Sequence, residues 1–363
     1  MTVRKPITVL IVDDSALMRQ VLSSILNAED DIRVVDTAPD PLSAREKIKK
    51  HCPDVVTLDV EMPRMSGLDF LNKIMTLRPM PVVMISSLTT AGADHAIKAL
   101  ELGAFDVVGK PSGLAADGMA CVAAEIVAKV RAAAVSRIAM PAPIARAPVS
   151  QSRLSAGAII AIGASTGGIP AIGTIVADLP TNAPPVVITQ HMPGGFTARL
   201  AERLNAACAV TVCEGRDGQP LLAGHVYIAP GGFMMTVERS GGPGARLRVR
   251  AGAPVNGFCP SVDVLFDSVA REYGRRAVAA LLTGMGSDGA RGLLRLRQSG
   301  AFTFGQDERT SVVYGMPRVA FELGAVCQQL PIEQMAAGLL HGEALPEQHQ
   351  PRRAASLPRS NAS

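Results

Sequence analysis

Residues 159–170 of this chain read Ile-Ile-Ala-Ile-Gly-Ala-Ser-Thr-Gly-Gly-Ile-Pro, and this stretch decides the fold of the second half. Its four leading apolar residues predict a buried strand, and the glycines and Pro170 predict a turn into a helix. A serine at such a turn, here Ser165, is exposed and lies near helix N-terminal amides that could stabilise an oxyanion. The letters fit a nucleophile turn of the G-x-S-x-G type. They fit a plain glycine-rich turn, placed against a phosphate or another backbone, equally well.

The composition indicates two α/β domains without a membrane segment. The chain has 363 residues, and a hydrophobic content of 48% with only 3% aromatic residues predicts aliphatic cores typical of parallel sheets. We see no apolar run of membrane-spanning length, no signal peptide and no zinc-type cysteine spacing, so we expect a cytoplasmic protein that is not inserted in a membrane. The net charge of +4 is small for this length, so we expect no nucleic-acid partner.

Two further buried strands of the second half lead into chemically active side chains. The strand 186–189 is followed by His191, and the strand 277–282 is followed by Asp288. The carboxyl ends of parallel strands meet at one edge of a sheet, so we expect Ser165, His191 and Asp288 to come together. A serine hydroxyl needs an imidazole to take its proton, and the imidazole needs a carboxylate to fix its tautomer. The chain order Ser, His, Asp differs from the Ser, Asp, His order of α/β-hydrolases.

Taken singly, His191 could be a packed strand-end residue and Asp288 could cap the next helix. The rival residues fit less well, because they lie in helical or tail contexts, begin a strand, or follow no buried strand: His51, His95, His225, His341, His349, Asp178 and Asp217. The remaining pattern of this half predicts helices near 170–179, 198–204 and 261–273, strands near 210–212 and 225–228, and a β-hairpin from 234–237 and 247–249.

In the first half of the chain, a different set of polar side chains again follows the ends of buried strands. Buried strands at 7–12, 54–58, 81–85 and 106–109 alternate with helical patterns and predict a doubly wound parallel sheet. Polar residues follow these strands: Asp13, Asp14, Asp59, Ser86 and Lys110. Three converging carboxylates are costly without a cation, and oxygen ligands favour Mg²⁺. The lysine and the hydroxyl complete a site that could hold a phosphoryl group on one carboxylate.

This half resembles a response-regulator receiver domain with a flavodoxin-like fold. The resemblance rests on Asp13-Asp14, on Asp59 with the run Met62-Pro63-Arg64-Met65-Ser66-Gly67, on Ser86, and on Lys110-Pro111. It implies that Asp59 accepts a phosphoryl group from a sensor histidine kinase and that Asp13, Asp14 and Asp59 hold Mg²⁺. It also implies that Lys110 contacts the phosphate and that Ser86 is the switch hydroxyl.

The sequence departs from the receiver pattern at two positions. Ser66 replaces a common acidic residue at what we expect to be a tolerant surface position. Val107 replaces an aromatic residue, which excludes an aromatic-rotamer switch there, and we do not assign that role to Phe105.

Prolines and polar residues divide the chain further. We expect the receiver over 6–131, a Pro/Ala/Ser-rich linker over 132–154, the second domain over 155–345 and a disordered tail over 346–363.

The second half resembles the catalytic domain of the chemotaxis protein-glutamate methylesterase family, CheB. The matching segments are Gly163-Ala164-Ser165-Thr166-Gly167-Gly168, Gln190-His191-Met192-Pro193 and the run from Leu282 to Ala290. The resemblance implies a doubly wound esterase with Ser165 as nucleophile, His191 as base and Asp288 as orienting acid. It also implies an oxyanion site from the backbone at Thr166 and Met285, and no cofactor for the esterase step. The implied substrate is a methylated glutamate on a cytoplasmic chemoreceptor helix, hydrolysed with release of methanol, and the family also deamidates certain glutamines.

Two other readings compete with a receiver that gates an esterase. A transcription factor would need a basic recognition helix after the linker, and none appears. A nucleotide-binding module would use residues 163–168 as a phosphate loop, but it lacks the G-x-G-x-x-G spacing and leaves His191 and Asp288 unexplained. We therefore expect the receiver to pack over the Ser165 cleft until Asp59 is phosphorylated.

Overall fold

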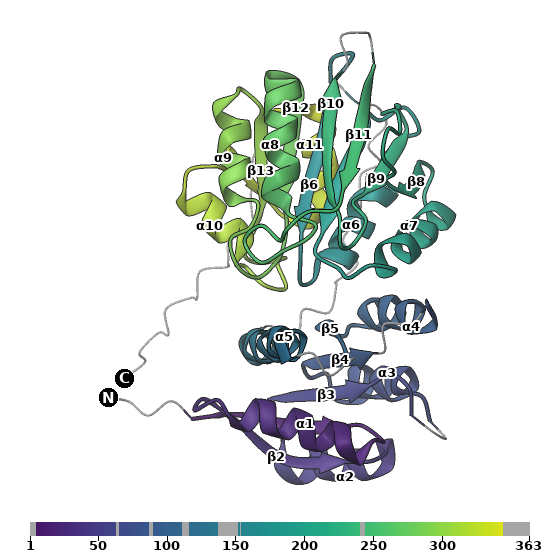
Figure 1. Cartoon of the computed structure of the whole chain (residues 1–363), viewed down its shortest axis with the longest axis vertical. Helices are drawn as coiled ribbons and strands as arrows, with labels where there is room; N and C mark the ends of the chain where they lie inside the picture. The colour runs from purple at the N-terminus through teal and green to yellow at the C-terminus, as the bar shows by residue number, and fades with distance from the viewer. Residues whose placement is uncertain are drawn as a thin grey trace, which may run out of the picture.

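The computed structural model describes residues 5–62, 65–86, 90–110, 116–136, 152, 154–239 and 244–343. Figure 1 shows two α/β domains stacked along the long axis of the molecule. Most of the linker, the tail, the hairpin tip at 240–243, and Pro63, Arg64 and Pro111 of the receiver motif lie outside the described residues. No described helix combines the length and the apolar character needed to cross a membrane.

The first domain is a parallel sheet with the strand order β2-β1-β3-β4-β5, as expected for a flavodoxin-like receiver. Its strands are β1 (Ile7–Val12), β2 (Ile32–Ala38), β3 (Val55–Asp59), β4 (Val82–Ser86) and β5 (Asp106–Gly109). Its helices are α1 (Ala16–Asn27), α2 (Pro41–His51), α3 (Gly67–Leu77), α4 (Thr90–Glu101) and α5 (Ala116–Val135). Helix α5 therefore continues four residues beyond Arg131, the expected end of the domain.

The second domain contains a seven-stranded parallel sheet in the order β14-β13-β12-β6-β7-β9-β8. Its strands are β6 (Ile159–Ala164), β7 (Val186–Gln190), β8 (Thr211–Glu214), β9 (His225–Ile228), β12 (Ala277–Leu281), β13 (Phe302–Gln306) and β14 (Gln328–Leu330). The predicted hairpin is present as β10 (Met234–Arg239) and β11 (Ala245–Arg250). The helices are α6 (Gly168–Ala177), α7 (Phe196–Ala207), α8 (Val262–Tyr273), α9 (Ala290–Gln298), α10 (Met316–Glu322) and α11 (Ile332–His341), with a short 3-10 turn at Gly274–Arg276.

Strand β6 shows why this sheet is covered on both faces. Successive side chains of a strand point to opposite faces, and every residue of β6 is buried. Ile160 and Ile162 belong to the core beneath α6, α7 and α11, whereas Ile159 and Ala161 belong to the core beneath α8, α9 and the hairpin. The continuous apolar run of β6 is thus the consequence of helices on both sides.

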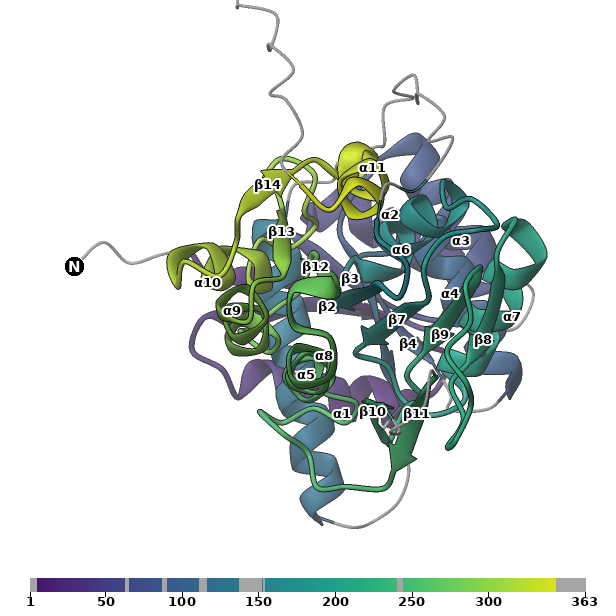
Figure 2. The ribbon, with the colours of Figure 1, turned by 90° about the horizontal axis from the view of Figure 1, so that it is seen from above.

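The receiver docks against the carboxyl end of the second sheet. Figure 1 shows α4, β5 and α5 on the side of the receiver that faces the second domain, and Figure 2, seen from above, shows the second domain lying over the receiver. Ala93 and Ala96 of α4 pack against Phe196 of α7, and Arg203 of α7 forms an ion pair with Glu101 of α4. The loops that carry the predicted catalytic residues therefore face the receiver rather than open solvent.

Candidate functional site

The three predicted catalytic residues lie after three neighbouring strands, β12, β6 and β7. The strands end in register, because Leu281 is aligned with Gly163 and Ala164 is aligned with Gln190. The Nε2 amide of Gln190 donates to the carbonyl of Ser165 at 2.9 Å and so ties two of the loops together. Parallel pairing thus brings side chains that are far apart in sequence to one edge of the sheet.

His191 and Asp288 form a direct hydrogen bond. His191 Nε2 lies 2.9 Å from Asp288 Oδ2, and the side chains are 6% and 0% exposed. Since Asp288 holds Nε2, the nitrogen left to accept a proton is Nδ1. Nδ1 is buried and has no hydrogen-bond partner among the described residues. The imidazole is therefore fixed on one side and available as a base on the other.

Asp288 is held as a carboxylate by several donors. Its Oδ1 accepts hydrogen bonds from Ser261 Oγ at 2.9 Å and Asn256 Nδ2 at 3.0 Å, and its Oδ2 accepts from the backbone N–H of Val262 at 2.7 Å. Burial opposes the charge, but the hydrogen bonds from His191 and Asn256 outweigh it and lower the pKa of Asp288. Asp288 also lies at the N-terminus of α8, where the helix dipole favours a negative charge. It does not cap α9, whose N-cap is Gly289.

Ser165 lies in the same cavity as His191 but forms no hydrogen bond with it. The cavity has a volume of about 340 Å³ and is lined by Ser165, Thr166, His191 and Met285. Among the described residues, Ser165 Oγ forms no hydrogen bond, and the backbone N–H groups of Thr166 and Met285 have no acceptor. The two backbone groups expected to bind the oxyanion thus line the cavity without an acceptor among the described residues.

Close packing holds the serine turn in place. Gly167, at φ 77°, begins α6, and Thr283 Oγ1 donates to the carbonyl of Thr166 at 2.9 Å. At Gly284 an added Cβ would lie 2.8 Å from the Cβ of Ser165, so only glycine lets these two loops approach.

The receiver contributes one wall of this cavity. Leu100, Asp106 and Val107 line it together with Ser165 and His191. Asp106 Oδ2 accepts a hydrogen bond from the hydroxyl of Thr166 at 2.5 Å, and Lys129 Nζ lies 3.3 Å from Asp106 Oδ1. The residue next to the predicted nucleophile is thus bound directly by the receiver.

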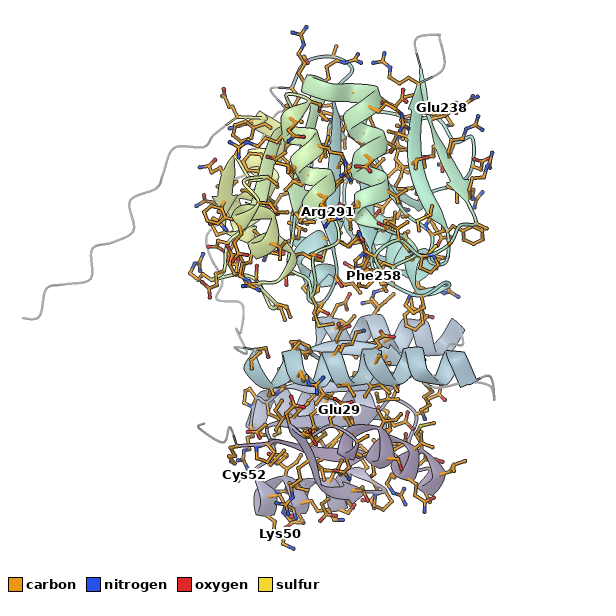
Figure 3. All side chains as sticks on the ribbon, turned by 60° about the vertical axis from the view of Figure 1, so that its left-hand side comes forward. Glu29, Lys50, Cys52, Glu238, Phe258 and Arg291 are labelled. Atoms are coloured by element: carbon orange, nitrogen blue, oxygen red, sulfur yellow. The ribbon has the colours of Figure 1, made fainter. Side chains whose placement is uncertain are left out.

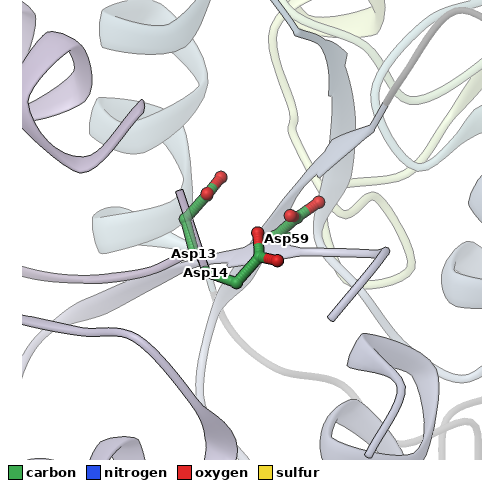
Figure 4. Close-up of side chains that lie close together, drawn as sticks. All are labelled: Asp13, Asp14 and Asp59. Carbon is green, nitrogen blue, oxygen red and sulfur yellow. The ribbon is translucent and has the colours of Figure 1, made fainter. Parts of the chain in front are cut away.

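The receiver has its own cluster of polar side chains at the ends of β1, β3 and β5. Carboxylate oxygens of Asp13, Asp14 and Asp59 all lie within 4.8 Å of one another (Figure 4). Lys110 Nζ is 2.7 Å from Asp59 Oδ2 and 3.6 Å from Asp13 Oδ2. Ser86 is fully buried at the end of β4, and its hydroxyl donates to the carbonyl of Gly92 at 3.2 Å.

Burial dominates the electrostatics of this cluster. It raises the pKa of Asp13 and of Asp59, and the nearby Lys110 offsets this only in part. Asp13 Oδ2 has no hydrogen-bond partner among the described residues. Unlike Asp288, these carboxylates lack enough donors for their charge.

Comparison with known proteins agrees with this division into two domains. Residues 9–116 match the response regulator receiver domain, and residues 160–339 match the CheB methylesterase domain. A Pseudomonas aeruginosa protein named protein-glutamate methylesterase/protein-glutamine glutaminase 2 is 52% identical over 341 residues, which cover 93% of this chain and 97% of the relative.

The chain belongs to the CheB methylesterase family. A Salmonella typhimurium protein named protein-glutamate methylesterase/protein-glutamine glutaminase is also 52% identical, over 92% of this chain and 96% of the relative. The crystal structure of the Thermotoga maritima CheB methylesterase catalytic domain matches with 37% identity and a TM-score of 0.50, covering 51% of this chain and 98% of that one. The predicted family and α/β fold are confirmed.

The structure adds a role for Ser66 and a contact for Val107, the two positions where this CheB-family chain departs from the receiver pattern. Ser66 is not only a surface residue, because its hydroxyl caps α3 by accepting the N–H of Asp69 at 3.2 Å. Val107, at the position of the missing aromatic residue, packs on the cluster formed by α4 and Phe196 of the catalytic domain. Phe105 is buried in the receiver core.

Sequence reasoning missed two residues that contact the candidate site, Asn256 and Phe258. The Phe258 ring stacks on His191 with centroids 3.8 Å apart and planes 5° apart. Neither residue follows a strand of the main sheet, so the strand-end rule did not point to them. The available signal was the dipeptide Asn256-Gly257 between two apolar residues, which favours a tight hairpin turn.

Proposed function

We propose that this CheB-family chain hydrolyses glutamate methyl esters on proteins, and deamidates glutamines, through Ser165, His191 and Asp288. The observation that carries the proposal is the pair formed by His191 Nε2 and Asp288 in the cavity that contains Ser165. The relatives' names give the two activities. An ester and a primary amide pass through similar tetrahedral intermediates, so one site serves both reactions.

The proposed reaction begins at the open nitrogen of His191. Ser165 Oγ attacks the side-chain carbonyl carbon of the substrate while His191 Nδ1 takes its proton, and the imidazolium is stabilised by Asp288. The oxyanion accepts hydrogen bonds from the N–H groups of Thr166 and Met285. The imidazolium then protonates the leaving oxygen or nitrogen as its bond to carbon breaks, so that methanol or ammonia departs. Water attacks the acyl-enzyme by the reverse proton path. Rotation of the Ser165 side chain toward Nδ1 on substrate binding completes the contact.

The substrate side chain fits the chemistry of the cavity wall. Apolar groups from Ile169, Met192, Phe258 and Pro260 surround the catalytic residues. Such a wall accepts the uncharged part of an ester or amide side chain, because it requires no polar partner there. We infer that the substrate is a segment of a chemoreceptor, and we assign the enzyme to the cytoplasm.

We propose that the receiver gates this reaction. In this structure Asp106, Val107 and Leu100 line the cavity, so a protein substrate has no free approach on that side. Phosphorylation of Asp59 by a sensor histidine kinase would change the charge at the end of β3, and Lys110 joins that site to β5, which carries Asp106. The docked state then loses stability relative to an open one.

The acidic cluster of the receiver fits a Mg²⁺ ion. Asp13, Asp14 and Asp59 supply only oxygen ligands, and Asp13 Oδ2 is buried without a hydrogen-bond partner among the described residues. When bound, Mg²⁺ would neutralise charge between the carboxylates and the phosphoryl group. Lys110 would bind a phosphoryl oxygen in place of its present contact with Asp59.

The test is release of methanol from methylated receptor membranes by the native chain and by Ser165→Ala. Native release that disappears in Ser165→Ala supports the proposal, and release that survives would remove Ser165 from the mechanism. Ammonia release from receptors with glutamine at these positions, measured on the same two proteins, tests the second activity. A native chain that releases neither product would contradict the proposed function.

A further inference from the structure

The segment Val255–Phe258 forms a tight turn beside the catalytic residues. Val255 and Phe258 exchange both backbone hydrogen bonds, each at 2.9 Å. Asn256 and Gly257 between them have φ of 54° and 84°. Positive φ at both central residues is the conformation that Asn-Gly favours in a two-residue hairpin. The directions of the Asn256 and Phe258 side chains are therefore fixed by the local backbone.

The side-chain amide of Asn256 bridges two buried carboxylates. Its Nδ2 lies 3.0 Å from Asp288 Oδ1 and 2.9 Å from Asp263 Oδ2. Asp263 is 6% exposed and also accepts the backbone N–H of Gly292 at 2.6 Å. An amide nitrogen has two hydrogens, so one group serves both acceptors and stabilises two like charges next to each other. Without it, Asp288 would lose a donor on the oxygen that does not face His191.

Phe258 covers one face of the His191 ring. The two rings are nearly parallel, with centroids 3.8 Å apart, and Phe258 lies on the side of the catalytic domain that faces the receiver (Figure 3). The hydrogen bond to Asp288 holds Nε2 but leaves the imidazole free to tilt about that contact. A flat apolar ring against its face prevents the tilt and keeps Nδ1 directed into the cavity.

We propose that the turn Val255–Phe258 is a positioning element of the esterase, in which Asn256 orients Asp288 and Phe258 orients His191. The inference rests on the proposed function, because it concerns the residues assigned there to proton transfer. Neither side chain needs to touch the substrate for this role.

The first test replaces the amide and keeps the turn. Asn256→Gly retains the left-handed backbone and removes both hydrogen bonds. We expect kcat for methanol release to fall about 10-fold with little change in KM, the scale of one hydrogen bond to a charged group. We also expect the acid limb of the kcat/KM profile to move to higher pH, because Asp288 becomes a stronger acceptor for the imidazolium. Asp263, with Arg295 nearby, faces Asn256, and Asp106, Glu125 and Lys129 line the same cavity as His191.

The matched control is Gly257→Asn in the same turn. Asparagine tolerates positive φ, and a Cβ at this position would meet no atom within 4 Å. We expect this variant to keep the native pH profile and a kcat well above that of Asn256→Gly, with KM the parameter that changes, because Gly257 lines the cavity. If Gly257→Asn lowers kcat as much as Asn256→Gly does, the effect belongs to the loop as a whole and the assignment to Asn256 is wrong.

The second test concerns the stacked ring. Phe258→Leu keeps an apolar side chain but removes the flat contact, and we expect kcat to fall about 5-fold with KM nearly constant. Phe258→Tyr keeps the ring and should restore most of the kcat that Phe258→Leu loses. Equal kcat for the leucine and native proteins would overturn the role of Phe258.

A proton NMR signal gives a readout that does not depend on turnover. The hydrogen between His191 Nε2 and Asp288 should give a strongly downfield resonance in the native chain, shifted in Asn256→Gly and unchanged in Gly257→Asn. An unchanged resonance and unchanged kinetics in Asn256→Gly would overturn the inference while the Ser165→Ala result still stands. A native chain without esterase activity would instead contradict the proposed function.

Discussion

Both sheets carry buried carboxylates at the carboxyl ends of their parallel strands, but the pKa values of these carboxylates are moved in opposite directions. In the receiver, Asp13 and Asp59 follow adjacent parallel strands, and burial raises the pKa of both. In the catalytic domain, Asp288 follows a parallel strand and is at least as deeply buried, yet its pKa is lowered. The difference lies in the donors. Asp288 receives hydrogen bonds from His191, Asn256, Ser261 and Val262, whereas one oxygen of Asp13 has none among the described residues.

This contrast indicates what each edge is built to do. A carboxylate whose charge is already satisfied can orient a base through a full catalytic cycle without changing protonation. A carboxylate cluster with too few donors is stabilised when a cation or a phosphoryl group arrives, so its energy depends on ligands. We call the carboxyl ends of β6, β7 and β12 the catalytic edge, and its charges are already stabilised. We call the carboxyl ends of β1, β3 and β5 the receiver edge, and its stability depends on bound ligands.

The largest expected effect on kcat comes from replacing Asp288, the carboxylate that accepts several hydrogen bonds. Asp288→Asn should lower kcat for methanol release by about 10³–10⁴-fold, because an amide no longer fixes the tautomer that leaves Nδ1 as the base. Steady-state kinetics with methylated receptor membranes measure this loss. Asp263→Asn is the control, since Asp263 shares Asn256 but does not contact His191, and its effect should be much smaller. Near-native activity in Asp288→Asn would show that the buried pair is not part of the mechanism.

A smaller effect should follow from weakening the contact between the two edges. Arg203→Glu places a negative charge opposite Glu101 of the receiver, and both side chains are partly exposed. Exposed ion pairs contribute little, so we expect unstimulated methanol release to rise only about 2- to 5-fold. Arg246→Glu, which disrupts a comparable, partly exposed pair with Glu238 on the hairpin of the second domain, should not change it. Equal rates for Arg203→Glu and the native chain would show that this pair does not hold the closed state.

The smallest expected effect is a change in thermal stability when Asp13 of the receiver is replaced. The folded-state pKa of Asp13 is raised, so the folded chain binds protons more tightly than the unfolded one, and stability falls as pH rises above the unfolded pKa near 4. Asp13→Asn removes this penalty and should raise Tm by a few degrees at pH 7 without Mg²⁺, with little difference near pH 3. Mg²⁺ should stabilise the native chain more than the variant. A lower Tm for Asp13→Asn at pH 7 would contradict the comparison.

The position of polar residues after buried strands was enough to predict which side chains meet at the carboxyl ends of each sheet. It did not predict the contacts that surround them. Asp13, Asp59, Ser165, His191 and Asp288 all follow buried apolar runs, and parallel pairing then places them without further information. Asn256 and Phe258 lie on a loop before α8, and their contacts depend on how that loop folds over the finished sheet.

The docking of the two domains was also beyond detailed prediction. The fusion suggested a receiver over the Ser165 cleft, but the hydrogen bond between Asp106 and Thr166 spans 60 positions and depends on rigid-body packing. No local pattern marks Val107 as a residue that packs on another domain. The absence of an aromatic residue at position 107 only excluded a rotamer switch, whereas the structure shows that Val107 packs against α4 and Phe196.

The central claim is that the receiver edge gates the catalytic edge. Its most direct test compares the native chain with Asp59→Asn. Methanol release from methylated receptor membranes is measured for each, with and without a small phosphodonor and Mg²⁺. We predict that the phosphodonor raises the native rate only when Mg²⁺ is present, and that Asp59→Asn releases methanol at one rate under all conditions. Stimulation of Asp59→Asn by the phosphodonor would contradict the account.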